Sequence, residues 1–392
     1  MKKFLALLLS VAIIIVFEVS VLGENEENLQ ETAVEAAPSI DIDVKSAILI
    51  EKSTGTILFE LNADEQLPPA SITKIMTLLL VMEAIDDGNL TMETKVTASE
   101  NACSMGGSQI WLEPGEEFTV HELLKASAIA SANDACVALA EAVCGSEEVF
   151  VDRMNQRAQE LGMTNTTFKN CTGLDAAGHV STARDISLMS MALLGHSEIK
   201  NYSTVWTESL RNGETQLTNT NRLVRFYKGC TGLKTGSTDE AGCCLAASAE
   251  RDGMELISVT LGSPHTEQRF AAGRKLLDYG FANFTVVRMT PPEEAVTEIP
   301  VVHGTKEKIT AVFDTPSTFL LKKGQENEIG QTVELPETLE APVEAGEKIG
   351  RVVVTLSGGE IGSYAILAKE SVPEMNFFTA LKTLFLGMIG TK

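Results

Sequence analysis

The chain has 392 residues, of which 44% are hydrophobic and 22% charged. This length and apolar content suit a large buried core and more than one domain, which excludes a disordered protein. The formal net charge of −23 argues against nucleic acid as a partner and against electrostatic attraction to anionic lipid.

The first segment predicts export. Two lysines precede an apolar run over residues 4–17, and small residues follow in the pattern of a signal-peptidase site. We therefore expect residues 1–23 to be a signal peptide and the mature chain to begin near Glu24, outside a bacterial-type cytoplasmic membrane. The alternative is a retained N-terminal anchor, which the shortness of the run disfavours. Residues 24–42 are acidic and lack aromatics, as expected of a tether.

Strands are predicted next, and helices follow them. Residues 46–61 hold two β-rich apolar runs around a Ser-Thr-Gly turn, the pattern of a hairpin. Further on, Thr119 and Glu122 form a capping box, and the helical stretch that they open ends at Gly145, a C-cap position. Residues 131–133, Ser-Ala-Asn, interrupt this stretch, so we expect two helices joined by a short polar corner.

A second group of strands closes this region. Residues 228–262 predict a three-stranded meander with a tight turn at Asp252-Gly253, and a helix follows at about 267–280. Strands at both ends with helices between them indicate one antiparallel sheet with helices packed on it. We assign this α+β domain, with its helical subdomain, to residues 43–286.

The rest of the chain predicts two smaller parts. Short alternating runs after a Pro-Pro pair indicate a small all-β domain over residues 293–370. In residues 372–392 apolar side chains recur on one helix face, which predicts an amphipathic helix too short to span a membrane and lying in its interface. The alternative is a terminal helix packed on its own protein, because few positive charges accompany it.

A buried lysine is the first sign of chemistry. Between Ser71 and Met82 the only charge is Lys74, in a run otherwise apolar on every side, and such a helix is normally buried. Burial favours the neutral amine. Since Ser71 and Lys74 are three residues apart, they share a helix face and the amine can take the serine proton. The helix N-terminus also offers backbone N–H groups to an oxyanion.

Two further elements could complete a site. In the polar corner, Ser131 could relay a proton while the Asn133 amide holds a substrate carbonyl. On a strand, Lys234 and Thr235 could hold a carboxylate, and Gly236 would let a substrate backbone approach. Each element also has a plainer interpretation: a helix cap with a snorkelling lysine, a second helix cap, and an edge-strand lysine beside a glycine bend.

Other catalytic signatures are missing from the sequence. The five histidines are distant from these elements along the chain, and there is no G-x-S-x-G elbow for an α/β-hydrolase triad. The sequence also lacks a Gly-rich phosphate loop and H-E-x-x-H, and its seven cysteines show neither C-x-x-C nor a zinc-ligand spacing. We therefore expect no metal and no cofactor.

In their order on helix, corner and strand, S-x-x-K, S-x-N and K-T-G resemble the signature set of the penicillin-interacting serine enzymes. The stretches LPPASITKIMT, GGSQIWLEPGE, SANDA, NCTGLDAAGHVSTARD and TGLKTGSTDEAG resemble those of low-molecular-mass penicillin-binding proteins, which are serine-type D-alanyl-D-alanine carboxypeptidases. With the β-rich appendix and the tail, the resemblance covers nearly all of the mature chain. It implies a β-lactamase/transpeptidase-like fold for the first domain.

The resemblance implies a role for each matching position. Ser71 would be the acylated nucleophile, Lys74 its general base and Ser131 a proton relay, while Asn133 would bind the peptide. Lys234 and Thr235 would hold the terminal carboxylate, and Gly236 would let the substrate backbone approach. The N–H of Ser237 would join that of Ser71 in the oxyanion hole. Arg269 is a looser match that would support carboxylate recognition.

The implied reaction removes the terminal D-alanine from peptidoglycan pentapeptide stems, with β-lactam antibiotics as covalent inhibitors of the same serine. It would take place at the extracytoplasmic face of the membrane, where the tail would be a peripheral anchor. One rival is a class A-like β-lactamase, which needs a second carboxylate; the nearest candidate, Glu160, lacks the E-x-x-L-N context. Another rival is a non-catalytic wall-binding or β-lactam-sensing protein, which the presence of all the key side chains disfavours.

Overall fold

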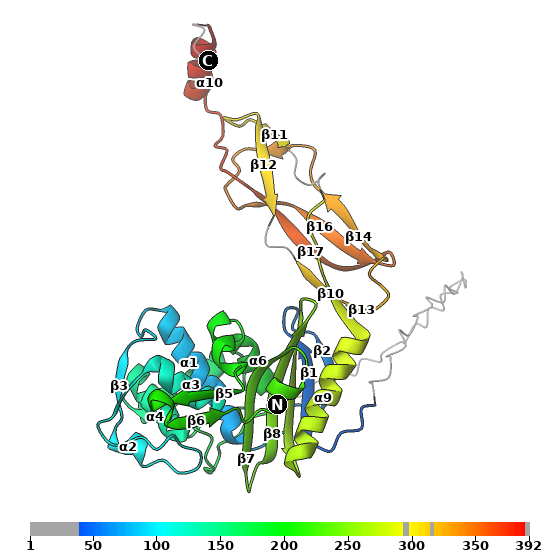
Figure 1. The fold of residues 1–392 in the computed structure, drawn as a ribbon. Helices are drawn as coiled ribbons and strands as arrows, with labels where there is room; N and C mark the ends of the chain where they lie inside the picture. The colour runs from blue at the N-terminus through cyan, green and yellow to red at the C-terminus, as the bar shows by residue number, and fades with distance from the viewer. Residues whose placement is uncertain (1–38, 293–297, 314–316, 389–392) are drawn as a thin grey trace, which may run out of the picture. The chain divides into compact units, whose positions relative to one another are not determined.

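The computed structural model describes residues 39–292, 298–313 and 317–388. The predicted signal peptide and most of the tether lie outside the described residues. Within the first domain an antiparallel sheet is covered by helices on both faces (Figure 1). The α+β prediction is therefore confirmed.

The sheet has five strands in the order β2-β1-β9-β8-β7, and every neighbouring pair is antiparallel. Its strands are β1 (Ser46–Glu51), β2 (Ile57–Leu61), β7 (Cys230–Thr238), β8 (Gly242–Arg251) and β9 (Met254–Ser263). The predicted hairpin and meander are both confirmed. At the predicted turn Asp252 and Gly253 have φ of 50° and 79°, as a type I′ hairpin turn requires. β7 lies at an edge of the sheet.

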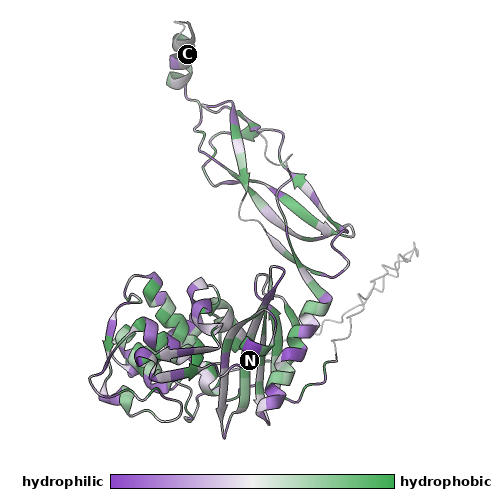
Figure 2. Cartoon of the chain, in the orientation of Figure 1, coloured by the Kyte–Doolittle hydropathy of each residue, from purple (hydrophilic) through white to green (hydrophobic). Residues whose placement is uncertain are grey.

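Both faces of the central strands are buried, which explains their nearly continuous apolar sequence. Along β9, Ile257 and Val259 face one core while Leu256 faces another, as the alternation of side chains in a strand requires. The second core lies against α9 (Thr266–Asn283), which extends the predicted helix at both ends. Figure 2 shows hydrophobic and hydrophilic patches alternating along α9, which matches a helix with one face on the sheet.

The first core lies between the other face of the sheet and a group of helices. They are η1 (Ala70–Thr73, a 3₁₀ turn), α1 (Lys74–Asp86), α2 (Glu100–Cys103), α3 (Val120–Ile129), α4 (Asn133–Cys144), α5 (Glu147–Glu160) and α6 (Ala183–Leu193). Shorter elements complete the domain: β3 (Lys95–Thr97), β4 (Glu117–Thr119), η2 (Ser197–Ile199), α7 (Lys200–Ser203), β5 (Thr207–Leu210), η3 (Arg211–Gly213), β6 (Thr215–Thr218) and α8 (Leu223–Phe226).

The predicted capping signals act as expected. The Glu122 N–H donates to Thr119 Oγ1 over 3.2 Å, and the Thr119 N–H donates to Glu122 Oε2 over 2.9 Å, which opens α3. Gly145 closes α4 with a left-handed φ of 82°. The corner between α3 and α4 lies at Ser131, whose φ is 63°. Two helices joined by a short corner are thus confirmed.

The region after α9 is rich in β-structure, as predicted. Six strands form a sheet in the order β14-β16-β17-β12-β11-β15, and β10 pairs with β13. Their bounds are β10 (Phe284–Arg288), β11 (Glu298–Val302), β12 (Lys308–Phe313), β13 (Thr318–Lys322), β14 (Ile329–Glu334), β15 (Leu339–Glu340), β16 (Lys348–Leu356) and β17 (Gly359–Ala368). Since β10 precedes the Pro-Pro pair and β13 follows it, strand pairing crosses the proposed boundary.

The tail forms α10 (Phe377–Met388), as its apolar spacing predicts. Its side chains Phe377, Phe378, Leu381 and Phe385 are all more than half exposed. Among the described residues, no helix has the length and apolar character needed to cross a membrane.

Candidate active site

The first motif lies on a tight turn that leads into α1. Ala70 has a left-handed φ of 48°, which is costly for a residue with a side chain, and Ser71 follows it in η1. Ser71 is partly exposed, whereas Lys74 at the start of α1 is fully buried. The Lys74 Nζ donates to Ser71 Oγ over 2.9 Å. The two side chains therefore meet as the three-residue spacing predicts.

A loop that the sequence did not predict contacts Lys74 as well. Its Nζ also donates to the carbonyl oxygen of Thr172 over 2.6 Å. Burial lowers the pKa of Lys74, which favours the neutral amine. Asn170 shapes the loop, since its Oδ1 accepts the N–H groups of Thr172 at 3.2 Å and Gly173 at 2.7 Å. The NCTGL stretch of the sequence contains this loop. The role of the Thr172 carbonyl could not be predicted from it, because every residue has a backbone carbonyl.

Gly173 is needed for this loop to approach the nucleophile. Its φ is +85°, and a Cβ at this position would lie 1.9 Å from the carbonyl oxygen of Ala70 and 2.9 Å from the Ser71 nitrogen. Real Cβ atoms do not come this close to backbone, so any side chain here would push the loop away from η1.

One histidine reaches this turn in spite of its distance in sequence. His179 is buried, and its Nε2 lies 2.8 Å from Thr73 Oγ1. The Lys169 N–H donates to Nδ1 over 3.2 Å, so the ring hydrogen is on Nε2 and Nε2 donates to Thr73. Burial lowers the pKa of His179 to about 4. A neutral imidazole thus supports the turn that carries Ser71 and Lys74.

The second motif ties the helix corner to a neighbouring loop. The buried Asn133 donates through Nδ2 to the carbonyl of Gly106 over 2.7 Å, and its N–H donates to Ser108 over 2.7 Å. Its Oδ1 has no hydrogen-bond partner among the described residues. Ser131, also buried, adopts left-handed backbone at the corner itself. Strained backbone thus occurs directly before the first motif and within the second.

The third motif lies on β7, directly beside the first. A Cβ on Gly236 would lie 2.8 Å from the Ser71 nitrogen and 2.9 Å from the carbonyl oxygen of Pro69, so only glycine allows this approach. Ser237, the next residue, is exposed. Residues 71 and 236 are far apart in sequence, and the fold brings them together at the sheet edge.

Lys234 is the least satisfied polar group of this motif. It is fully buried, and its Nζ has no hydrogen-bond partner in the described part of the chain. Burial is the main cause that lowers its pKa to about 7, and the positive charge of Lys74 adds to the effect. A buried cation without a partner needs an anion, which a substrate carboxylate could supply.

Arg269 also contacts this strand. From α9, its guanidinium donates through Nη1 to the carbonyl of Gly236 over 2.9 Å, and Arg269 is buried. Its Nε has no hydrogen-bond partner among the residues that the structure describes. The looser sequence match at Arg269 therefore falls beside the K-T-G strand.

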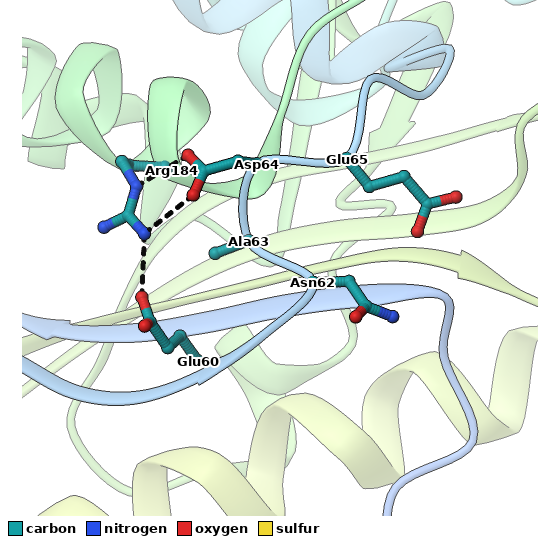
Figure 3. A pocket seen from close by; sticks show the side chains of 6 residues that line it. All are labelled: Glu60, Asn62, Ala63, Asp64, Glu65 and Arg184. Atoms are coloured by element: carbon teal, nitrogen blue, oxygen red, sulfur yellow. Dashed lines mark hydrogen bonds and ion pairs between the residues drawn. The ribbon is translucent and has the colours of Figure 1, made fainter.

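A surface pocket lies elsewhere in the domain. It has a volume of about 560 Å³ and contains none of the predicted site residues (Figure 3). Arg184 spans it, with Nε 2.7 Å from Asp64 and Nη2 2.8 Å from Glu60. This arginine comes from the STARD stretch and fixes the segment between β2 and η1.

Glu160, the candidate second carboxylate for a class A-like β-lactamase, also lies away from the three motifs. Glu160 is exposed at the end of α5, where it pairs with Arg153 at 2.8 Å and Arg157 at 3.1 Å. Among the described residues, no cluster of three or more His, Cys, Asp and Glu side chains could hold a metal ion.

Comparisons with known proteins identify the family. Residues 30–265 match the model of peptidase family S11, D-alanyl-D-alanine carboxypeptidase, and residues 284–374 match that of the penicillin-binding protein 5 C-terminal domain. D-alanyl-D-alanine carboxypeptidase DacF of Bacillus subtilis is 41% identical over 387 residues, 97% of each chain.

Two solved structures are similar as well. Penicillin-binding protein 5 of Haemophilus influenzae has a TM-score of 0.76 and 31% identity, covering 86% of this chain and 99% of that one. Penicillin-binding protein D2 of Listeria monocytogenes, solved with ampicillin bound, has a TM-score of 0.57 and 34% identity over 62% of this chain and all of that one. The chain therefore belongs to the S11 family of serine peptidases, the D-alanyl-D-alanine carboxypeptidases, and carries the C-terminal domain of penicillin-binding protein 5.

Proposed function

We propose that Ser71 is the residue acylated by the substrate and that Lys74 is its general base. The observation that carries this proposal is the 2.9 Å hydrogen bond between a buried lysine and a partly exposed serine. Neutral Lys74 takes the hydroxyl proton as Ser71 Oγ attacks the carbonyl of the penultimate D-alanine. The N–H groups of Ser71 and Ser237 stabilise the oxyanion, and Ser131 relays a proton to the departing D-alanine. Water then hydrolyses the ester.

The substrate peptide pairs with the free edge of β7 as an additional strand. Its terminal carboxylate accepts hydrogen bonds from Lys234 and Thr235, and Arg269 adds positive charge behind them. The absence of a side chain on Gly236 lets β7 lie against Ser71, and the Asn133 amide holds the peptide from the opposite side. The unpartnered Lys234 Nζ and the edge position of β7 support this arrangement.

The substrate is the pentapeptide stem of peptidoglycan, and β-lactams acylate the same serine. The ampicillin complex of the Listeria relative supports the second statement. Since Glu160 is paired with two arginines on the surface, it does not activate water at Ser71, and a penicillin adduct clears slowly. The acidic net charge of −23 supports a protein that does not bind nucleic acid.

The protein acts outside the cytoplasmic membrane. The N-terminal pattern at residues 1–23 directs export, and α10 holds the chain at the membrane surface through its exposed aromatic side chains. Residues 43–286 are the catalytic domain and residues 293–370 the β-rich domain, with β10 leading from one to the other. The two family matches support two domains.

One experiment tests the nucleophile and the reaction together. The purified chain without residues 1–23 is incubated with a peptide that ends in D-Ala-D-Ala, and released D-alanine is measured; labelling with a fluorescent penicillin is followed in parallel. We expect release and a long-lived label, both lost in Ser71→Ala. Label that survives this substitution would refute the assignment of Ser71. Intact labelling without any release would favour the β-lactam-sensing alternative.

A further inference from the structure

A bend of three residues joins the motifs behind the candidate site. Asn219 and Asn221 are both buried, and each is anchored to a different part of the backbone. The Asn219 Nδ2 donates to the carbonyl of Val205 over 2.8 Å, while the Asn221 Nδ2 donates to the carbonyl of Gly232 in β7 over 2.8 Å. Thr220 lies between these two anchors, so its position is set from both sides.

Thr220 makes hydrogen bonds to the helix that precedes the second motif and to the strand that carries the third. Its N–H donates over 3.1 Å to the carbonyl of Ile129, the last residue of α3 before the polar corner. Its Oγ1 accepts a hydrogen bond of 2.8 Å from the hydroxyl of Thr235. Among the described residues, no acceptor receives the hydrogen of the Thr220 hydroxyl itself. Thr220 therefore keeps one unused donor beside the proposed carboxylate site.

The direction of this hydrogen bond matters, because Thr235 has a single hydroxyl hydrogen. Without substrate that hydrogen points to Thr220. A carboxylate can only accept, so Thr235 must turn its hydrogen toward the substrate in order to bind it. The Thr235 oxygen then needs a donor on its other side, and Thr220 has one available. A chain from Thr220 through Thr235 to the carboxylate polarises both hydroxyls in the same sense.

We propose that Thr220 is a positioning residue that reverses its hydrogen bond with Thr235 when substrate binds and thereby sets the preference for a free terminal carboxylate. This inference rests on the proposed function, since it assumes that Thr235 faces the carboxylate. Thr220 does not touch the substrate and takes no part in acyl transfer. Its effect is on selectivity between leaving groups that bear a carboxylate and leaving groups that do not.

The test uses two thioester analogues of the substrate, one with a carboxylate on its leaving group and one with that carboxylate methylated. In Thr220→Val we expect kcat/KM for the carboxylate thioester to fall about tenfold, mainly through KM, because a charge-assisted hydrogen bond loses its support. For the methylated thioester we expect a change of less than about twofold. Thr220→Ser keeps a hydroxyl and should restore the selectivity.

Thr218→Val on the exposed face of β6 is the matched control and should leave both rates unchanged. Equal losses on both thioesters would mean a merely structural role and would overturn the proposal, as would an unchanged selectivity in Thr220→Val or a failure of Thr220→Ser to restore it. The proposed function fails separately, if the unaltered chain releases no D-alanine from the peptide. Thermal melting of each variant identifies any loss of folding.

Discussion

Two buried lysines occupy one small region, and each bears on the other's protonation. The pKa values of Lys74 and Lys234 are both lowered, chiefly by burial, and the charge of Lys74 acts on Lys234. Two ammonium groups in a poorly solvated site repel each other, so the site favours one proton over two. The proposed chemistry needs this state, with Lys74 neutral as the base and Lys234 charged for the carboxylate.

The pH dependence of kcat/KM follows from Lys234. Its pKa of about 7 means that it is charged below this pH and loses its charge as the pH rises through it. Since a neutral Lys74 no longer contributes its charge, we expect kcat/KM for a D-Ala-D-Ala peptide to fall at a pH of about 7 or above, because a neutral Lys234 amine no longer attracts the carboxylate. Lys234→Arg keeps a charge at all these pH values and should remove the fall. If the fall in kcat/KM at high pH persists in Lys234→Arg, the titration of another group causes it.

At the scale of elements, the site depends on close backbone contacts between η1, β7 and the loop at residues 170–174. Gly173 and Gly178 offer a matched pair for testing one of these contacts, since both have left-handed φ, of +85° and +77°. A Cβ on Gly173 meets the backbone of Ala70 at 1.9 Å, whereas a Cβ on Gly178 meets only the Lys169 Cε at 3.6 Å.

We expect Gly173→Ala to lower the rate of penicillin acylation by about a hundredfold or more, because displacing the Thr172 carbonyl removes the second partner of Lys74. Gly178→Ala should cost only about 1 kcal/mol of unfolding free energy for its backbone conformation and should acylate normally. Acylation rates and thermal melting of both variants are the measurements. Equal acylation by the two variants would show that the close contact does not matter.

The elements and the motif residues could be predicted because their signals are local. The capping box at Thr119, the turn at Asp252-Gly253 and the pair Ser71 and Lys74 all depend on neighbours within four residues. The residues of the candidate site that the sequence did not predict depend on tertiary contacts. Thr172 acts through a carbonyl oxygen that every residue possesses, and His179 is brought to Thr73 from 106 residues away.

At the scale of the whole molecule, α10 has an exposed apolar face that none of the other described residues covers. Phe378, Leu381 and Phe385 lie at helical spacing, with exposed fractions of 79%, 54% and 65%. Net repulsion is expected between an acidic protein and anionic lipid, so binding should depend on these apolar side chains and vary little with salt.

Deleting residues 372–392 should abolish binding to phospholipid vesicles in a sedimentation assay and leave D-alanine release intact. The triple change Phe378→Ser, Leu381→Ser and Phe385→Ser should have the same effect, because each serine removes apolar area that would enter the interface. Ala380→Ser is the control and should bind. Vesicle binding that is unchanged by the deletion would refute an anchoring role for the tail.

The order of strands in the sheet governs when the candidate site can form during synthesis of the chain. β1, made early, pairs with β2 on one side and with β9 on the other, and β9 emerges some two hundred residues later. η1, which bears Ser71, rests against β7 and is likewise completed late. A nascent chain that ends before β9 therefore has Ser71 without the complete sheet. The close approach of Ser71 to the backbone of β7 is therefore a late product of folding.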